Sequence, residues 1–256
     1  MKRLKEILYN VISSQVPKNE PVALLFSGGT DSLTVFWTLH DLGVPVTCYT
    51  FRLTYYESTD SRISKMACKH WKTPHKIITE DTRPKIEQVK SVIEIIKSYR
   101  KTHVEVMYGY YFLLQAIKER HVFSGLQADT LFGSNKNSAI KCRNMDAKGF
   151  ANYRRELYLN PDQEGLYPAY TLATHFKKTL HTPYTHQTVR DFLCQYSWRE
   201  LNSPKQKMPS IIAFKERFLE IPIYRHDDNF QCGSRIREHL HTLVPQYRKI
   251  YDETNR

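Results

Sequence analysis

The segment at positions 21–43, PVALLFSGGTDSLTVFWTLHDLG, constrains the fold of this chain more than any other. It starts with a short, uninterrupted apolar run, which is typical of a strand buried on both faces of a parallel sheet. Leu33, Phe36 and Trp37 then recur at helical spacing, and Gly43 stands where such a helix would end. The segment therefore predicts a buried strand, a glycine-containing turn and a helix in succession.

Strand-like and helical patterns alternate through the first half of the chain. Alternation of this kind predicts parallel strands joined by right-handed helical crossovers, with helices on both faces of the sheet. We therefore expect an α/β domain with a parallel sheet over residues 1–145. Its strands are expected at 22–26, 44–51, 74–79 and 121–125, and its helices at 3–15, 33–43, 57–72, 84–99 and 103–120.

Strand patterns weaken after about residue 145, where the sequence becomes aromatic, basic and mostly helical in its periodicity. Residues 146–256 are predicted to form a mainly helical, substrate-side region that packs on the sheet domain. The helices expected there lie at 146–157, 164–180, 185–197, 208–219 and 233–250.

The composition favours a cytoplasmic protein with an anionic partner. No apolar run is long enough to span a membrane, and the basic start of the chain is not followed by the apolar stretch of a signal peptide. The net charge of +12 suits nucleic acid, nucleotides or acidic small molecules, and a solvated basic surface is the simpler alternative. The five cysteines include no Cys-x-x-Cys pair, which is typical of reduced thiols.

The turn between the first strand and its helix has the composition of an anion-binding site. Gly28 and Gly29 let the backbone curl and come close to a ligand, because glycine has no Cβ atom. Ser27, Thr30 and Ser32 add hydroxyl donors to the backbone N–H groups at the helix start, where the helix dipole also favours negative charge. The turn is therefore predicted to bind a phosphate or pyrophosphate.

Asp31 is out of place beside a phosphate unless a metal ion lies between them. A Mg²⁺ ion, which prefers carboxylate and phosphate oxygens, would join Asp31 to the phosphates. The structural alternative is that Asp31 and Ser32 only cap the helix. The turn lacks the Gly-Lys-Ser/Thr of a P-loop and the third glycine of the dinucleotide-binding fingerprint.

Four segments, in order, carry a family resemblance. The hexapeptide at 27–32 resembles the SGGxDS loop of the PP-loop N-type ATP pyrophosphatases, which cleave ATP between its α- and β-phosphates and adenylate a substrate. The segment VFSGLQADTLFG at 122–133 is similar to the S-G-E-G-A-D-E-L-F-G segment of the asparagine synthetase family. Segments 181–193 and 207–214 resemble later motifs of that family. The resemblance implies the adenine nucleotide alpha hydrolase-like (HUP/PP-loop) fold with a C-terminal helical part.

The resemblance also implies roles for individual residues. The 27–32 loop would bind the pyrophosphate of ATP, and Asp31 and Asp129 would hold Mg²⁺. Ser124 and Gly125 would line the ribose and adenine side. Both aspartates follow predicted strands, and the carboxyl ends of parallel strands are where ligands bind in such sheets. The alternative for Asp129 is a helix cap.

Phe51 and Lys207 complete the implied site. Phe51 stands just past the expected second strand, where backbone groups usually contact the adenine edge, and the alternative is a core residue. Lys207 would neutralise charge that grows on the α-phosphate and the leaving pyrophosphate. Lys205 is the competing choice, and a surface lysine is the alternative for both. Arginines are candidates for binding an anionic substrate or for surface charge, namely Arg143, Arg154, Arg155 and Arg190.

The chain departs from the family pattern at two positions. Leu126 and Thr130 stand where the family has glutamates, and Leu126 cannot move a proton during attack by an amine. No cysteine follows Met1, so the family's N-terminal glutaminase domain is not expected in this chain. Nitrogen would then come as free ammonia, from a separate glutaminase partner, or from another amine.

Three functions remain open from the sequence. The first is an AMP-forming ligase that adenylates a small-molecule acid, a carboxylate, with ATP and Mg²⁺ before an amine attacks. The second is a PP-loop enzyme that modifies tRNA or DNA bases, which the +12 charge and seventeen tyrosines favour. The third is a nucleotide-binding protein without catalysis, which the two missing glutamates favour.

Overall fold

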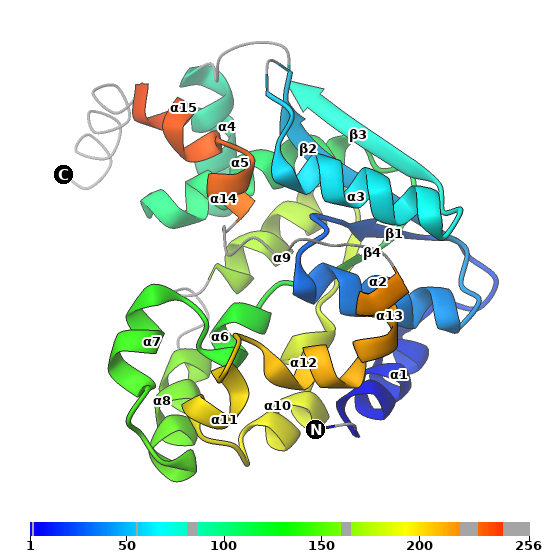
Figure 1. Ribbon diagram of the computed structural model, residues 1–256. Coiled ribbons are helices and arrows are strands. Elements are labelled where there is room, and N and C mark those ends of the chain that lie inside the picture. Colours follow the sequence, from blue (N-terminus) through cyan, green and yellow to red (C-terminus); the bar gives the residue numbers. More distant parts are fainter. Residues whose placement is uncertain (2, 55, 81–85, 160–164, 221–229, 243–256) are drawn as a thin grey trace.

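The computed structural model describes residues 1, 3–54, 56–80, 86–159, 165–220 and 230–242 (Figure 1). In this part of the chain, five parallel strands form one sheet in the order β3-β2-β1-β4-β5. The strands are β1 (Val22–Leu25), β2 (Val46–Leu53), β3 (His75–Glu80), β4 (His121–Ser124) and β5 (Thr179–His181). The expected α/β fold with a parallel sheet is confirmed.

Helices pack on both faces of this sheet and continue beyond it (Figure 1). Those of the first half are α1 (Arg3–Gln15), α2 (Thr30–Asp41), α3 (Thr59–His70), α4 (Ile86–Ile96), α5 (Lys101–Ala116), α6 (Ala128–Phe132) and α7 (Lys136–Cys142). Those of the second half are α8 (Ala147–Leu159), α9 (Leu166–His175), α10 (Gln187–Leu193), α11 (Trp198–Asn202), α12 (Met208–Ala213), α13 (Lys215–Glu220), α14 (Phe230–Gly233) and α15 (Ile236–Thr242), with a 3₁₀ turn at Pro183–Thr185.

The strand order creates a ligand site at one edge of the sheet. The chain runs from β1 outward through β2 to β3, and then returns so that β4 pairs with the other side of β1. The connections leave β1 and β4 in opposite directions, which opens a crevice at their carboxyl ends. The register pairs Leu25 with Ser124, so the segments that follow these two strands start side by side.

The alternation of side chains along β1 divides the core into two layers. Val22 and Leu24 face the layer that contains α1 and α2, whereas Ala23 and Leu25 face the layer that contains α4, α5 and α9. Each of these strand side chains is buried, which explains why the strand reads as a continuous apolar run. Helices packed on both faces of the sheet hold β1 in place, and with it the glycine turn that follows the strand.

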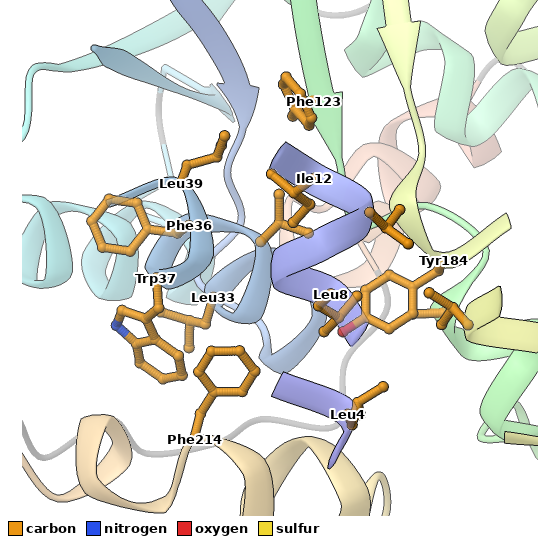
Figure 2. Close-up of a cluster of buried hydrophobic side chains, with 14 of the residues drawn as sticks. Leu4, Leu8, Ile12, Leu33, Phe36, Trp37, Leu39, Phe123, Tyr184 and Phe214 are labelled. Carbon is orange, nitrogen blue, oxygen red and sulfur yellow. The ribbon is translucent and has the colours of Figure 1, made fainter. Parts of the chain in front are cut away.

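The first layer is built largely from aromatic and aliphatic side chains of α1 and α2 (Figure 2). Trp37 of α2 is fully buried and its ring stacks on Phe214, with 5.7 Å between ring centroids. Phe218 of α13 meets the same indole edge-on at 4.7 Å. Through these contacts α2 holds α12 and α13, and with them the chain around position 207, against the sheet domain.

The second half differs from its prediction in one important respect. The pattern at 164–180 predicts one helix, but α9 ends at His175 and Thr179–His181 forms β5, which pairs with β4. The helical prediction is therefore wrong for these residues. A strand of only three residues has no periodicity that distinguishes it from the end of a helix. The proposed division at residue 145 stays a prediction.

Other differences concern short helices and boundaries. The short helices α6, α7 and α11 were not predicted, because five to seven residues carry little periodic signal. The prediction at 208–219 corresponds to two helices, α12 and α13, and the one at 233–250 extends past the described residues. In the described part, no helix is long and apolar enough to cross a membrane. The four cysteines whose side chains are described are free.

Candidate active site

A cavity of about 1470 Å³ lies at the carboxyl ends of the central strands. Its walls include Ser27 and Asp31 after β1, Thr50 and Phe51 of β2, and Gly125 after β4. The cavity is thus centred on the edge of the sheet where β1 and β4 diverge. The sequence-predicted loop and the later segments meet in one space that is large enough for a nucleotide and a second reactant.

The glycine turn after β1 has a conformation that only glycine adopts easily. Gly28 has a φ of +76°, and a Cβ atom there would lie 2.6 Å from the Ile63 side chain of α3. Gly29 is extended and precedes the first turn of α2, with no side chain capping that helix. The helix-cap alternative for Asp31 and Ser32 is therefore wrong, and the α2 N-terminus is open toward the cavity.

Hydrogen bonds within the turn fix its hydroxyl groups. The Gly29 N–H donates to Ser27 Oγ at 3.2 Å, and Ser32 Oγ donates to the Gly29 carbonyl at 3.1 Å. The two serine hydroxyls lie 3.2 Å apart. Ser27 and Thr30 both line the cavity, so the turn presents hydroxyl and backbone N–H donors at the helix start.

Gly125 brings the end of β4 against the start of α2. A Cβ atom at Gly125 would lie 2.9 Å from the backbone carbon of Asp31 and 2.9 Å from the Ser32 nitrogen. The absence of a side chain therefore allows two backbones to touch. Gly125 also lines the cavity. Its close contact with α2 sets the distance between the segment after β4 and the turn after β1, a role that the family resemblance does not imply.

Lys207 joins the two aspartates. Its Nζ lies 2.5 Å from Asp31 Oδ2 and 2.6 Å from Asp129 Oδ1. The Asp31 and Lys207 side chains are mostly buried, with 18% and 14% of their surface exposed, whereas half of the Asp129 side chain is exposed in the cavity. The three residues, separated by up to 176 positions in the sequence, thus meet at one point of the cavity.

Two alternatives from the sequence are removed by this geometry. Lys207 is not a surface lysine, whereas Lys205, the competing choice, is exposed at the cavity rim. Asp129 is not a helix cap, since Gln127 occupies that position of α6 and has no side-chain capping bond. Asp129 Oδ1 accepts instead from Ser134 Oγ at 2.6 Å, which fixes its carboxylate.

Asn202 positions the backbone of Lys207, and no sequence pattern indicated it. Asn202 is buried, and its Oδ1 accepts from the Lys207 N–H at 3.2 Å. Its Nδ2 donates to the carbonyls of Phe132 at 2.7 Å and Trp198 at 3.1 Å. One amide thus ties α11, the end of α6 and the lysine together. Lys207 itself has a φ of +59°, a left-handed conformation that this bond helps to maintain.

If the cavity binds Mg²⁺-ATP as the sequence predicts, Asn202→Ala should lower that affinity about tenfold, because the variant leaves the Lys207 N–H without its acceptor. The backbone there would leave its left-handed conformation and carry the ammonium away from the two carboxylates. Titration of Mg²⁺-ATP by calorimetry measures the change. Asn144→Ala, which removes an exposed amide bonded to Arg199, is the matched control. Equal affinities of Asn202→Ala and the control would contradict the assigned role.

The charges in the cluster shift one another's pKa values. Burial raises the pKa of Asp31 to about 6, against the attraction of Lys207 and with the repulsion of Asp129. Desolvation also acts to raise the pKa of Asp129, but the ammonium of Lys207 outweighs it and lowers that pKa. Desolvation acts to lower the pKa of Lys207, and the two carboxylates together raise it instead. Lys207 is therefore a permanent cation in this site.

The raised pKa of Asp31 has a consequence for stability. An unfolded aspartate ionises near 3.8 and the folded one near 6, so between these values the folded state binds the additional proton. The contribution of Asp31 to the free energy of unfolding therefore falls as the pH rises from about 4 to about 6. Since one pKa unit corresponds to about 1.4 kcal/mol, this loss amounts to about 2–3 kcal/mol.

Asp31→Asn, which cannot ionise, is expected to remove this loss. The stability of Asp31→Asn minus that of the wild type should increase between pH 4 and 6 and then level off. Urea unfolding at several pH values, without metal or nucleotide, measures it. A difference that does not depend on pH would show that Asp31 ionises normally in the folded protein.

The carboxylates fit a magnesium ion that arrives with phosphates. Asp31 Oδ1 is buried and accepts no hydrogen bond from any described residue. Among those residues, no group of three His, Cys, Asp or Glu side chains is arranged to hold a metal. Mg²⁺ commonly takes one or two carboxylates and completes its shell with water and phosphate oxygens. Asp31 and Asp129 are suited to that kind of site.

Phe51 lies deeper in the sheet than expected, whereas Ser124 lies at the cavity wall. Phe51 lies within β2, not beyond it, and its fully buried side chain stacks on Phe112 at 5.9 Å. The predicted strand end is therefore wrong by two residues, and the core alternative is correct for this side chain. Ser124 is buried and its Oγ lies 3.2 Å from Tyr110 Oη at the cavity wall.

Arg154 does not bind substrate through its guanidinium. The side chain is fully buried over the Phe150 ring and donates to the carbonyls of Leu131, Leu193 and Tyr196. The interpretation as an anion-binding arginine is wrong here, because these bonds hold α6 and α10 together. Arg143, Arg155 and Arg190 do not line the cavity.

Comparison with known proteins gives one extended match. A family model described as "Asparagine synthase" matches residues 3–229. None of the curated proteins matches the chain.

Two solved structures show a distant likeness. A predicted subunit of tRNA methyltransferase from Methanocaldococcus jannaschii is 17% identical, with 82% of this chain and 93% of that chain covered at a TM-score of 0.37. The U34-tRNA thiolase NcsA from Methanococcus maripaludis, with its 4Fe-4S cluster, is 16% identical, with 86% and 79% covered at a TM-score of 0.31. TM-scores this low carry no property of either protein over to this chain.

Proposed function

Because the chain belongs to the asparagine synthase family, we propose that it cleaves ATP between the α- and β-phosphates, transfers AMP to a substrate oxygen and releases pyrophosphate. The match over residues 3–229 confirms the resemblance seen in the four sequence segments. Membership of this PP-loop family indicates an enzyme that uses ATP. The adenylated substrate, the nucleophile and the need for Mg²⁺ are parts of the proposal.

One observation carries the proposal: Lys207 Nζ lies within 2.6 Å of both Asp31 and Asp129 at the open N-terminus of α2. A phosphate chain there would meet backbone N–H groups, hydroxyl donors and a fixed cation. Two carboxylates at the same point suit the metal that accompanies a triphosphate.

Each group has a role in the proposed reaction. Asp31 and Asp129 would hold Mg²⁺, which supplies positive charge to the phosphate oxygens. The Ser27–Ser32 turn binds the β- and γ-phosphates through its hydroxyl and N–H groups. Lys207 donates to oxygens on which negative charge increases as the α–β phosphate bond breaks. Its raised pKa keeps this donor protonated over the whole physiological range.

The substrate class proposed first is a carboxylate, followed by a nitrogen nucleophile. A carboxylate oxygen attacks the α-phosphorus and pyrophosphate leaves. An amine then attacks the acyl carbon and AMP leaves with that oxygen. Leu126 and Thr130 both line the cavity and neither can accept a proton in this step. The proton that the nitrogen loses after attack would therefore pass to the departing phosphate of AMP or to water, and the amine would be free ammonia, ammonia from a separate glutaminase, or another amine.

Isotope transfer tests this mechanism. The protein is incubated with ATP, Mg²⁺, ammonia and a panel of acids labelled with ¹⁸O in the carboxylate, and the nucleotide products are analysed by mass spectrometry. The proposal expects AMP and pyrophosphate in equal amounts, with one ¹⁸O atom in the AMP. Production of ADP, or of AMP that carries no label, would exclude adenylation of the acid.

The second candidate is modification of a nucleic-acid base, which the net charge of +12 favours. In that case the oxygen that attacks the α-phosphorus belongs to a base carbonyl. RNA affinity should then fall steeply as salt increases, because bound phosphates release counterions. AMP release that requires RNA, and not an acid, would identify this function. Tight ATP binding without AMP in either assay would identify the non-catalytic alternative.

A further inference from the structure

The chain beyond the family match contributes to the wall of the cavity. The match ends at residue 229, and α14 and α15 follow it. Phe230 and Arg237, one from each helix, line the same cavity as the Ser27–Ser32 turn. Figure 1 shows α14 and α15 beside α5, at the side of the molecule away from α12 and α13. Residues outside the shared family region therefore shape the site.

The segment that contains α14 and α15 packs against a glycine in α5. A Cβ atom at Gly109 would lie 2.6 Å from Phe230 Cζ and 3.0 Å from Ile236 Cδ1. Gly109 lies inside a sixteen-residue helix, where glycine is less favourable than alanine by about 1 kcal/mol. Packing thus explains why a glycine stands at this position of the helix, since any side chain there would displace the Phe230 ring and Ile236.

Polar contacts add to this docking. Arg237 Nε lies 3.3 Å from Glu105 Oε2, and Glu105 is only 1% exposed. The guanidinium of Arg235 lies over the Tyr56 ring, 3.8 Å from its centroid. Ser234 is fully buried and its Oγ donates to the Phe230 carbonyl at 2.6 Å. The position of Phe230 is therefore set by contacts on both sides of it.

The cavity has an apolar end at this point. Met107 and Tyr110 of α5 line it, together with Phe51 of β2, Leu126 and Phe230. The Phe230 ring centroid lies 5.8 Å from that of Tyr110, and the two rings meet edge to face. The Ser27–Ser32 turn forms a polar part of the same cavity. An apolar, aromatic end next to a phosphate site has the chemistry that a nucleotide base requires.

We propose that Phe230 contacts the base of the bound nucleotide, so that residues 230–242 complete the base-binding end of the site. The inference rests on the proposed function, because it assigns an orientation to the nucleotide in that same cavity. The base would lie among Phe230, Tyr110 and Met107, with the phosphates at the Ser27–Ser32 turn. Aromatic side chains stack on bases of any sequence, and truncation of such a side chain weakens binding measurably.

Binding of three probes to Phe230→Ala tests the proposal. We expect the affinity for ATP and for adenosine to fall at least about tenfold, whereas the affinity for Mg²⁺-pyrophosphate, which has no base, stays within about twofold of the wild type. Unchanged pyrophosphate binding also shows that the variant is folded. Tyr167→Ala, which truncates an exposed aromatic residue, is the matched control and should bind all three probes normally.

Two further variants test the contact itself. Phe230→Tyr keeps an aromatic ring and should retain the wild-type ATP affinity, whereas Phe230→Leu should not. Gly109→Ala leaves Phe230 in the chain but displaces its ring. This variant should therefore bind ATP and adenosine more weakly and bind Mg²⁺-pyrophosphate as the wild type does. If the wild type binds ATP and Phe230→Ala binds it equally well, the inference is overturned and the proposed function stands. If the wild type binds neither ATP nor pyrophosphate, both are overturned.

Discussion

Substitution Lys207→Met is expected to lower the rate of AMP formation about a thousandfold. In other enzymes, removal of a single preorganised hydrogen-bond donor to a developing negative charge lowers kcat by a factor of about 10²–10³. Lys207 supplies a full charge as well as a hydrogen bond, and its ammonium is fixed by two carboxylates at 2.5 and 2.6 Å. Methionine preserves the length and apolar stem of the side chain. Single-turnover formation of AMP, with enzyme in excess over ATP, measures the chemical step.

The neighbouring lysine provides the control. Lys205 is exposed at the rim of the same cavity, so Lys205→Met removes the same charge from the surface and should change the rate less than about threefold. Equal losses in Lys205→Met and Lys207→Met would mean that only the overall positive charge matters. An unchanged rate in Lys207→Met would remove this lysine from the proposed chemistry.

The second large effect is expected for Asp129→Asn. The amide keeps the size of the carboxylate and lacks its charge, so Mg²⁺ would lose one of its two protein ligands. We expect AMP formation to fall at least about a hundredfold at 1 mM Mg²⁺, since even the loss of a residue that only orients a metal ligand costs about 10- to 100-fold in affinity or activity. The rate is measured as a function of Mg²⁺ and then Mn²⁺ concentration.

Metal dependence distinguishes a ligand from a structural carboxylate. If Asp129 binds the metal, higher metal concentrations should recover part of the lost rate, and Mn²⁺ should recover more than Mg²⁺ because nitrogen and oxygen sites bind it more tightly. Asp191→Asn, which changes an exposed carboxylate on α10, should behave as the wild type. A rate loss in Asp129→Asn that is the same at every metal concentration would contradict metal binding.

Local sequence was sufficient to predict the central strands and the glycine turn after β1. Val22–Leu25 is apolar throughout because both faces of β1 are covered, and the glycines that follow have a conformational reason to be glycines. The aspartates could be placed at one edge because each follows a parallel strand. Each of these features depends on at most a few neighbouring residues, so the pattern in the sequence contains it.

Features that depend on distant contacts could not be predicted in the same way. β5 is three residues long and becomes a strand only by pairing with β4. Asn202 has no motif, and its role comes from three backbone groups that belong to separate segments. Phe230 belongs to none of the sequence segments that resemble the family. Its place in the cavity depends on one glycine, Gly109, more than a hundred positions earlier.

The bridge from Lys207 to Asp31 and Asp129 has a consequence for the order in which ligands enter. The ammonium stands where a divalent ion would otherwise meet both carboxylates. A divalent ion that enters alone must therefore compete with a like charge already in place. A divalent ion that enters on a triphosphate brings oxygens toward which the lysine can turn. In the proposed reaction, the resting protein would therefore disfavour bare ions and take up the metal and its nucleotide together.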